Sequence, residues 1–219
     1  MTEIDYEKAR FNMIEQQIRP WEVLDSRVLE VLGSVPREDY VPARYRALAF
    51  TDVAIPLGHG EVMMHPNVEG RLLQALAIKP GDRILEVGTG SGFLSACLAR
   101  LGREVRSVDI HPEFSAAAAD KLRHHGVRNV LLETGDAARG WGEGLFDVVV
   151  LTGSLPQLFE NWRARLAPGG RLFAVVGEAP VMEATLVIRG GEHECFTESL
   201  FETVLPPLKN ADRPVAFEF

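Results

Sequence analysis

Cysteine is scarce in this chain. Only Cys97 and Cys195 occur among the 219 residues, so the sequence offers neither a disulfide framework nor the spacing of a cysteine-based metal site. Long apolar runs are also missing, because no stretch approaches the roughly 20 residues that span a bilayer, and Met1–Arg10 lacks the apolar core of a signal peptide. Lys and Arg number 23 against 31 Asp and Glu, and the resulting net charge of −8 disfavours a broad phosphate-binding surface. We expect a cytoplasmic protein that binds neither nucleic acid nor a membrane.

The length and composition are those of an ordinary globular protein. The apolar fraction of 46% is typical of a chain that buries a full core, and we expect one domain over residues 1–219. Within it, residues 1–66 predict a preface of short helices and loops, 67–180 a ligand-binding core, and 181–219 a C-terminal hairpin and tail. We find no internal repeat, and the oligomeric state is not predicted.

Apolar runs and helical spacings alternate along the middle of the chain. The expected helices are Tyr6–Ile18, Asp25 or Ser26 to Leu32, Ala43–Phe50, one that starts at Pro66, Pro112–His124 and Pro156–Leu166. The expected strands are Ile84–Val87, Val105–Asp109, Asn129–Glu133, Phe146–Leu151 and Arg171–Val176. Residues 51–66 mix Gly and Pro with apolar residues and predict a loop or hairpin held against the core. This alternation favours right-handed βαβ units and a parallel sheet.

The most informative stretch is Ile84-Leu-Glu-Val-Gly-Thr-Gly-Ser-Gly92. Its apolar start reads as a buried strand, and Phe93–Leu101, which follows, has helical spacing. The glycines between them let the backbone turn sharply and let a ligand lie against the main chain. The free N–H groups at the helix start add hydrogen-bond donors and partial positive charge. A strand, a glycine turn and a helix N-terminus in this order predict a cofactor site.

The spacing and the flanking acids indicate which cofactor. A pyrophosphate-binding turn reads G-x-G-x-x-G, whereas this one reads G-x-G-x-G with Glu86 two residues before it. An acid so close repels a pyrophosphate but can pair with an ammonium group. Asp109 ends the next strand, roughly 20 residues on, where an acid accepts hydrogen bonds from ribose hydroxyls. The combination predicts S-adenosylmethionine, and it disfavours a nicotinamide cofactor.

Two more segments complete the predicted cofactor site. Asp136, after Gly135, would face the adenine amino group with Ala137 beside it, and Thr152 ends the most apolar strand at the same crevice. The predicted cofactor-binding residues are Glu86, Gly88, Thr89, Gly90, Ser91, Gly92, Asp109, Ile110, Asp136, Ala137 and Thr152.

The end of the chain distinguishes this fold from the dinucleotide-binding one. Glu183–Arg189 and His193–Val204 predict two antiparallel strands joined by a two-residue turn, Gly190-Gly191. A mostly parallel sheet that ends in such a hairpin, with helices on both faces, is the α/β arrangement of Rossmann-like S-adenosylmethionine-dependent methyltransferases.

Several segments are similar to those of one enzyme family. They are Gln17-Ile18, Val35-Pro-Arg-Glu-Asp-Tyr-Val-Pro42, Asp52-Val-Ala-Ile-Pro-Leu-Gly58, Leu85–Gly92, Gly135-Asp136, Gly140-Trp141 and Pro168-Gly-Gly-Arg-Leu172. Over roughly residues 10–180 the chain thereby resembles the protein-L-isoaspartate (D-aspartate) O-methyltransferases, whereas the tail after Val181 is not covered. The resemblance implies methyl transfer from S-adenosylmethionine to the α-carboxylate of isoaspartyl residues in a protein or peptide. The ester then closes to a succinimide that reopens partly to normal aspartate, which repairs the protein. It also places the preface on the substrate side.

One loop departs from the family pattern. Family members usually read Gly-Gln-Thr-Ile-Ser-x-Pro here, whereas this chain reads Gly60-Glu-Val-Met-Met-His-Pro66. Val62 and Met64 thus replace the residues that family enzymes place beside the substrate carboxylate, and neither side chain can donate a hydrogen bond. No catalytic residue is assigned, and the substrate-loop candidates are His59, Val62, Met64 and His65.

The same loop raises other possibilities. His59, Glu61 and His65 could ligate a metal ion, but without a fourth ligand or a defined helical spacing we predict no metal site. His59 or His65 could instead contact an anionic substrate. Two alternatives to the repair reaction stay open: an S-adenosylmethionine-dependent methyltransferase with a different acceptor, and a catalytically weak S-adenosylmethionine-binding member of the family.

Overall fold

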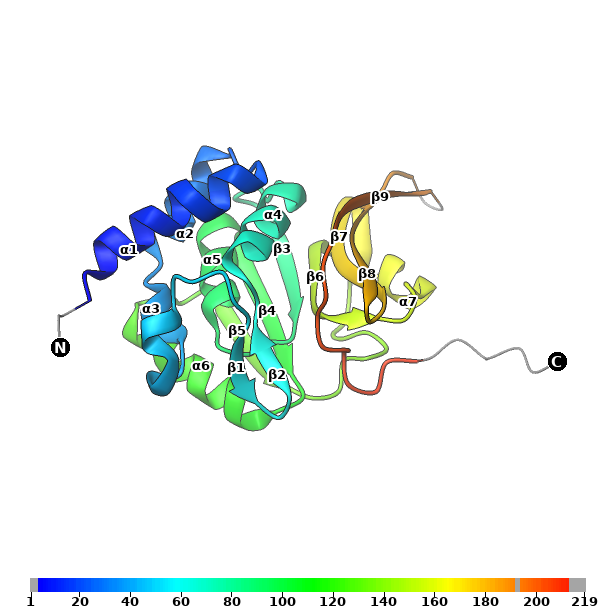
Figure 1. Ribbon diagram of the computed structural model, residues 1–219. Helices are drawn as coiled ribbons and strands as arrows, with labels where there is room; N and C mark the ends of the chain where they lie inside the picture. The colour runs from blue at the N-terminus through cyan, green and yellow to red at the C-terminus, as the bar shows by residue number, and fades with distance from the viewer. Residues whose placement is uncertain (1–3, 192–193, 213–219) are drawn as a thin grey trace.

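The computed structural model describes residues 4–191 and 194–212. Its centre is a seven-stranded sheet with the order β5-β4-β3-β6-β7-β8-β9 (Figure 1). The strands are β3 (Arg83–Val87), β4 (Glu104–Asp109), β5 (Val130–Thr134), β6 (Phe146–Leu155), β7 (Leu166–Glu178), β8 (Val181–Arg189) and β9 (Cys195–Glu202). The pairs from β5 to β7 are parallel, and β8 and β9 add antiparallel pairs. A separate small hairpin consists of β1 (Ile55–Gly58) and β2 (Glu61–Met63).

Helices precede the sheet and connect its strands. In chain order they are α1 (Tyr6–Met13), the π-helix η1 (Ile14–Ile18), the 3-10 helix η2 (Arg19–Trp21), α2 (Ser26–Ser34), α3 (Arg37–Tyr40), the 3-10 helix η3 (Ala43–Leu48), α4 (Pro66–Leu76), α5 (Phe93–Leu101), α6 (Pro112–His124) and α7 (Glu160–Arg163). Asp25 caps α2 as its sequence position predicts, because its carboxylate accepts from the N–H of Arg27 at 2.8 Å. Pro66 occupies the first turn of α4, where its missing N–H costs nothing.

Several predicted elements differ in extent from the structure, and in two places the prediction is wrong. The helix predicted over Pro156–Leu166 is reduced to the four residues of α7, because Leu166 pairs with Phe146 and thus begins β7. The connection between β8 and β9 is longer than the two-residue Gly-Gly turn, since Arg189 pairs with Cys195. Residues 192–193, and with them the predicted strand start at His193, lie outside the described residues.

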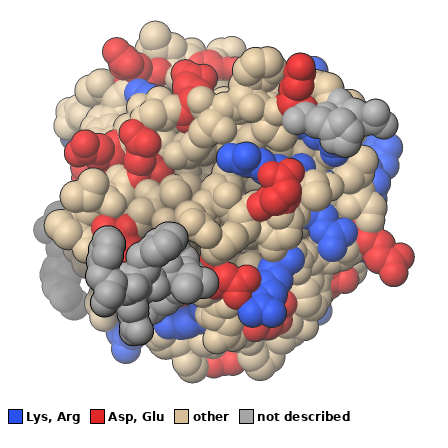
Figure 2. All heavy atoms as spheres, turned by 90° about the vertical axis from the view of Figure 1, so that its right-hand side faces the viewer, with Lys and Arg blue, Asp and Glu red and all other residues tan. Residues whose placement is uncertain are grey.

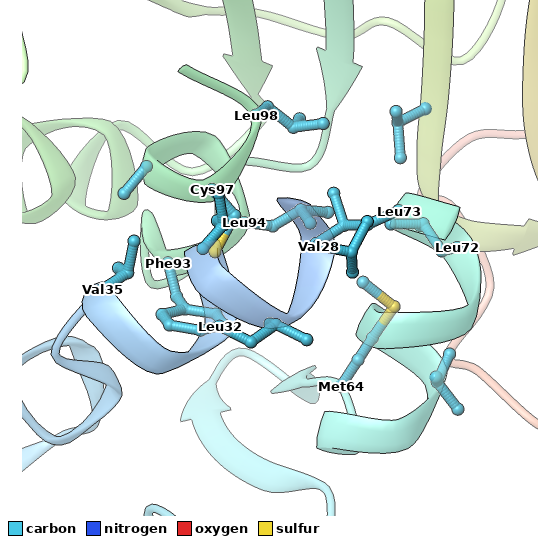
Figure 3. Packing of buried hydrophobic residues seen from close by; sticks show 14 of the residues in the cluster. Val28, Leu32, Val35, Met64, Leu72, Leu73, Phe93, Leu94, Cys97 and Leu98 are labelled. Atoms are coloured by element: carbon cyan, nitrogen blue, oxygen red, sulfur yellow. The ribbon is translucent and has the colours of Figure 1, made fainter. Parts of the chain in front are cut away.

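The sheet separates two apolar layers. Ile84 faces the layer under α2, α4, α5 and α6, whereas Leu85 faces the other, because alternate residues of a strand point to opposite faces. Figure 3 shows labelled side chains of α2, α4 and α5 pointing toward one another in the first layer, with Met64 beside α4. The second layer is covered by α7, whose Trp162 is fully buried, and by irregular segments. Helices therefore lie on both faces, but unequally.

The helices and the charged side chains on the surface show what the sequence leads us to expect about membranes and phosphate-binding surfaces. None of the helices in residues 4–191 and 194–212 is long and apolar enough to cross a membrane. Figure 2 shows the end of the molecule formed by β7–β9, where acidic and basic side chains are interspersed and do not gather into one basic area.

Arg171 ties α4 to the sheet from within the core. Its guanidinium donates to the carbonyl oxygens of Leu76 and Ala77 at 2.9 Å each and to the carboxylate of Asp82 at 2.6 Å. Arg171 and Asp82 are both buried. The pair fixes the end of α4 and the turn before β3, which begins the glycine motif.

Replacing Asp82 tests this tie. Asp82→Ala leaves the Arg171 guanidinium buried without its counter-charge, and we expect the free energy of unfolding in urea to fall by about 3–5 kcal/mol. The control is Glu104→Ala, which removes an exposed carboxylate that pairs with Arg83 and should cost at most about 1 kcal/mol. Equal losses in the two variants would contradict the assignment.

Candidate functional site

A cavity of about 840 Å³, open mouth included, lies at the carboxyl ends of β3, β4 and β6. Most of the lining comes from the segments that follow β3, β4 and β5, from β6, from the β1–β2 hairpin and from the tail. The lining residues are Leu57, Glu61–Met64, Glu69, Val87–Ser91, Leu94, Val108–His111, Phe114, Gly135–Ala138, Thr152, Gly153 and Pro206–Lys209.

The glycine turn after β3 is held closely against its neighbours. Gly88 has φ of 98° and donates to the carbonyl of Val108 at 2.8 Å. The hydroxyl of Thr152 lies 2.9 Å from the carbonyl oxygens of both Val87 and Gly88. A Cβ atom on Gly88 would lie 2.0 Å from that hydroxyl, so only glycine fits. Thr152 thus lines the cavity and also positions the turn.

Asp109 lies at the end of β4 and organises two segments. One carboxylate oxygen accepts from the N–H of Gly90 at 2.8 Å and the other from the N–H of His111 at 2.9 Å. Burial raises the pKa of Asp109, against the lowering effect of these two hydrogen bonds. Its carboxylate retains further lone pairs at the cavity wall, which hydroxyl groups of a ligand can use.

Asp136 connects the loop after β5 to the tail. Its carboxylate accepts from the N–H of Ala138 at 3.0 Å and from the side-chain amide of Asn210 at 2.8 Å. Asp136, Ala137 and Ala138 all line the cavity.

Glu86 lies beneath the cavity and is not among its lining residues. Strand alternation explains this position, because Glu86 faces the same layer as Ile84 and meets the first turn of α5. Its carboxyl accepts a hydrogen bond from the hydroxyl of Ser95, while its other oxygen, Oε1, is buried without a hydrogen-bond partner. Burial raises the pKa of Glu86 to about 8, and hydrogen bonds from Ser107 and Ser95 oppose the shift. From this position Glu86 does not reach a ligand in the cavity directly, and its contact with a cofactor through water stays a prediction.

A second buried carboxyl, which the sequence analysis did not single out, does reach the cavity. Glu69 lines it from the first turn of α4 and pairs with the buried guanidinium of Arg37. Arg37 also donates to the carbonyls of Ala49 and Met64, both at 2.8 Å. Burial raises the pKa of Glu69 although Arg37 lowers it. Arg37 thereby holds the main chain at Met64, directly after β2.

The four substrate-loop candidates divide between the cavity and its outside. Val62 and Met64 line the cavity, and Met64 is also part of the apolar core, with only 5% of its surface exposed. His65 is directed away and lies 2.9 Å from Asp52. His59 stands at the tip of the β1–β2 hairpin and pairs with Glu113. Of the predicted cofactor residues, Gly92 and Glu86 are the ones outside the lining.

The tail contributes residues that no sequence motif indicated. Pro206–Lys209 line the cavity, and the N–H of Leu208 donates to the carbonyl of Ser154 at 2.8 Å. Lys209 lies 3.1 Å from Glu61 across the cavity mouth. The bridge between Ser154 and Pro207 places this tail beside β6. This wall forms through contacts between segments that are far apart in the sequence. The periodicity of apolar residues therefore could not predict it.

The chemistry of the lining suits S-adenosylmethionine better than a dinucleotide. Among the described lining residues, four are carboxylic acids (Glu61, Glu69, Asp109 and Asp136), and Lys209 is the one Lys or Arg. A pyrophosphate would be repelled by such a wall, whereas ribose hydroxyls, an amino group and a sulfonium are favoured by it.

Comparisons with known proteins agree with this chemistry. A sequence model of the protein-L-isoaspartate(D-aspartate) O-methyltransferases matches residues 8–211. The chain is 39% identical to protein-L-isoaspartate O-methyltransferase 1 of Anaeromyxobacter sp. (strain Fw109-5) over 86% of this chain and 91% of the relative. It is 41% identical to protein-L-isoaspartate O-methyltransferase of Anaeromyxobacter dehalogenans (strain 2CP-C) over 84% of this chain and 88% of the relative.

The fold is likewise similar to a solved structure. The crystal structure described as a protein-L-isoaspartate O-methyltransferase from Plasmodium falciparum, in complex with S-adenosyl-L-homocysteine, superposes with a TM-score of 0.77. The match covers 94% of this chain and 99% of that one at 20% identity, so it concerns the fold.

The buried Glu86 carboxyl predicts a pH dependence of stability. Its folded-state pKa of about 8 exceeds the ordinary 4.5, so the folded protein keeps a proton that the unfolded chain has lost. The stabilising contribution is present below about pH 4.5 and is lost as the pH rises through about 8. As the pH rises through this window, the free energy of unfolding should fall less in Glu86→Gln than in the wild type. At about 1.4 kcal/mol per pKa unit, the difference should reach up to several kcal/mol.

Urea unfolding at a series of pH values measures this difference. Glu30→Gln, on the exposed face of α2, is the control and should follow the wild-type curve. If the Glu86→Gln and wild-type curves run parallel from about pH 5 to about pH 8.5, the assignment of a neutral Glu86 is wrong.

Proposed function

This chain belongs to the protein-L-isoaspartate(D-aspartate) O-methyltransferase family, and we propose from that premise that it methylates the α-carboxylate of isoaspartyl residues in proteins or peptides. S-adenosylmethionine is the methyl donor. The observation that carries the proposal is the acid-lined cavity at the strand ends, which the glycine turn after β3 borders. The product ester would close to a succinimide, which restores part of the damaged residue to aspartate.

The proposed roles of the cavity residues follow from their positions. We propose that Asp109 accepts hydrogen bonds from the ribose hydroxyls and that Asp136, with Ala137 and Ile110, faces the adenine. The main chain of Gly88–Ser91 would border the amino-acid end of the cofactor. Glu86 would contact the ammonium group of the cofactor through a water molecule. The positive charge of the cofactor would then lower the pKa of Glu86 and favour its ionised form.

The reaction needs orientation more than proton transfer. The cofactor supplies an electrophilic methyl group on a sulfonium, and the acceptor carboxylate is ionised at neutral pH. No general base is therefore required of the protein. Holding nucleophile, methyl carbon and sulfur in line can contribute about 7–11 kcal/mol in well-oriented systems. The hairpin β1–β2 and the Arg37 hydrogen bond to Met64 would supply that rigidity.

The lining of the substrate side favours a second candidate, a methyltransferase with a different acceptor. Val62 and Met64 present apolar side chains to the cavity where the resemblance implies hydroxyl groups. Glu69 adds a carboxyl that repels an anionic acceptor whenever Arg37 does not neutralise it. An acceptor with an apolar body or a positive charge would suit this wall better.

A methyl-transfer assay distinguishes the two candidates. We expect the protein to bind S-adenosyl-L-homocysteine in calorimetry and to transfer labelled methyl from S-adenosylmethionine to an isoaspartyl peptide as a base-labile ester. The same peptide with normal aspartate is the control and should remain unlabelled. Tight cofactor binding without label on the isoaspartyl peptide would refute the repair reaction and support a different acceptor.

Met64 provides a test of the loop itself. Met64→Ser supplies a hydroxyl donor that can orient a carboxylate, and we expect kcat/KM with the isoaspartyl peptide to rise on the order of tenfold above that of Met64→Ala. Both variants empty the same buried space, and each should lose about 2–5 kcal/mol of stability. Activity is therefore compared per folded molecule, with the folded fraction taken from circular dichroism. Equal kcat/KM values for the two variants would show that the missing hydroxyl is not what limits the reaction.

A further inference from the structure

Two histidines and a glutamate from distant segments meet at the mouth of the cavity. His59 lies at the tip of the β1–β2 hairpin, while His111 and Glu113 lie at the start of α6. Each residue offers a ligand atom, and these atoms all lie within 4.8 Å of one another. The rings of His59 and His111 are stacked with centroids 4.3 Å apart. Phe114 contacts both rings edge-on, at 5.6 Å from His59 and 5.2 Å from His111.

The hydrogen bonds of this cluster are incomplete. Nε2 of His111 is buried and has no hydrogen-bond partner. The nearest carboxylate to it is that of Glu61, at 3.8 Å, which Lys209 already approaches at 3.1 Å. The backbone N–H of His111 donates to Asp109 and fixes the residue, whereas His59 and Glu113 are half exposed and can adjust. A buried imidazole nitrogen without a hydrogen-bond partner calls for an explanation. Together with the second imidazole and the carboxylate beside it, it could bind a metal ion.

The backbone at His59 adds an independent observation. His59 has φ of 54° and the following Gly60 has φ of 82°, so both central residues of the hairpin turn are left-handed, as in a type I′ turn. Histidine is one of the few residues besides glycine that occupy this region readily. From this tip the side chain of His59 reaches His111 and Glu113.

We propose that His59, His111 and Glu113 bind one Zn²⁺ ion, which cross-links the β1–β2 hairpin to the start of α6. Two imidazoles and one carboxylate, with water in the fourth position, form one of the common ligand sets of zinc. In the tetrahedral geometry that zinc prefers, bonds of about 2.0–2.2 Å hold two ligand atoms about 3.3–3.6 Å apart. The three ligand atoms, which lie within 4.8 Å of one another, therefore need to approach by up to about 1.5 Å. The stacked ring of His59 must also turn so that both imidazole lone pairs point to one ion, and the exposed side chains of His59 and Glu113 leave room for these movements.

The cross-link would act on the cavity. The hairpin supplies Leu57 and Glu61–Met63 to one wall, and the start of α6 supplies His111 and Phe114 to the adjoining wall. Zinc between His59 and His111 fixes these two walls to each other across the mouth. Exchange of the bound cofactor would then be slower in the metal-loaded protein. This effect rests on the proposed cofactor site, whereas zinc binding itself does not.

Zinc binding is tested on the full chain by titrating Zn²⁺ into the metal-free protein in a calorimeter. We expect one equivalent to bind and the thermal midpoint to rise with Zn²⁺ but not with Mg²⁺. Co²⁺ should give the visible absorption of a four-coordinate ion. Glu113→Gln and His59→Ala, both at exposed positions with little risk to folding, should each weaken Zn²⁺ binding at least about tenfold.

His65→Ala is the matched control, because His65 is an equally exposed histidine of the same loop that lies beside Asp52 instead. It should bind Zn²⁺ as the wild type does. The proposal is overturned if no stoichiometric site is found, or if His65→Ala weakens binding as much as His59→Ala. The cross-link is measured by the dissociation rate of S-adenosyl-L-homocysteine, which we expect to fall several-fold with Zn²⁺ in the wild type and not in His59→Ala. Equal rates with Zn²⁺ and with chelator would refute the cross-link, whereas failure of S-adenosyl-L-homocysteine to bind at all would refute the cofactor site and leave the zinc titration unaffected.

Discussion

The close approach of Thr152 to the turn after β3 is the constraint on which the cavity depends. Its hydroxyl lies 2.9 Å from two consecutive carbonyl oxygens, those of Val87 and Gly88, and there is no room for a side chain between them. This contact holds the ends of β3 and β6 together while the N–H of Gly90 is held by Asp109 from β4. Three strand ends and one glycine turn thus form a single rigid floor, from which α5 starts. A ligand meets main chain there because no side chain can intrude.

The protein buries two carboxyls near that floor, Glu86 beneath the cavity and Glu69 at its wall, and they behave differently. Glu86 has no cationic partner and relies on the hydroxyls of Ser95 and Ser107, so burial raises its pKa strongly. Glu69 has the guanidinium of Arg37, which in turn holds the carbonyl of Met64. Charge in this layer is therefore adjustable near neutral pH. A positively charged cofactor above it would draw Glu86 toward its ionised form, which couples binding to proton release.

The walls above the floor come from parts of the chain that are fixed in different ways. The segments after β4 and β5 continue from the sheet, whereas the β1–β2 hairpin is anchored by the buried side chains of Ile55 and Met63, and the tail by that of Leu205. Glu61, placed between His111 and Lys209, is the point where hairpin, α6 and tail come together.

The sequence by itself determined the strand, glycine turn and helix order, the acid at the end of β4 and the parallel sheet with its antiparallel end, because each depends on local spacing. The family resemblance also drew attention to Val62 and Met64, and the structure places both at the cavity. Tertiary structure alone decided that Glu86 lies under the cavity and Glu69 at its wall, that the tail closes one side, and that His59 meets His111 and Glu113 and not His65. The physical reason is distance along the chain: periodicity reports which face a residue occupies, but it does not report which remote segment packs against that face.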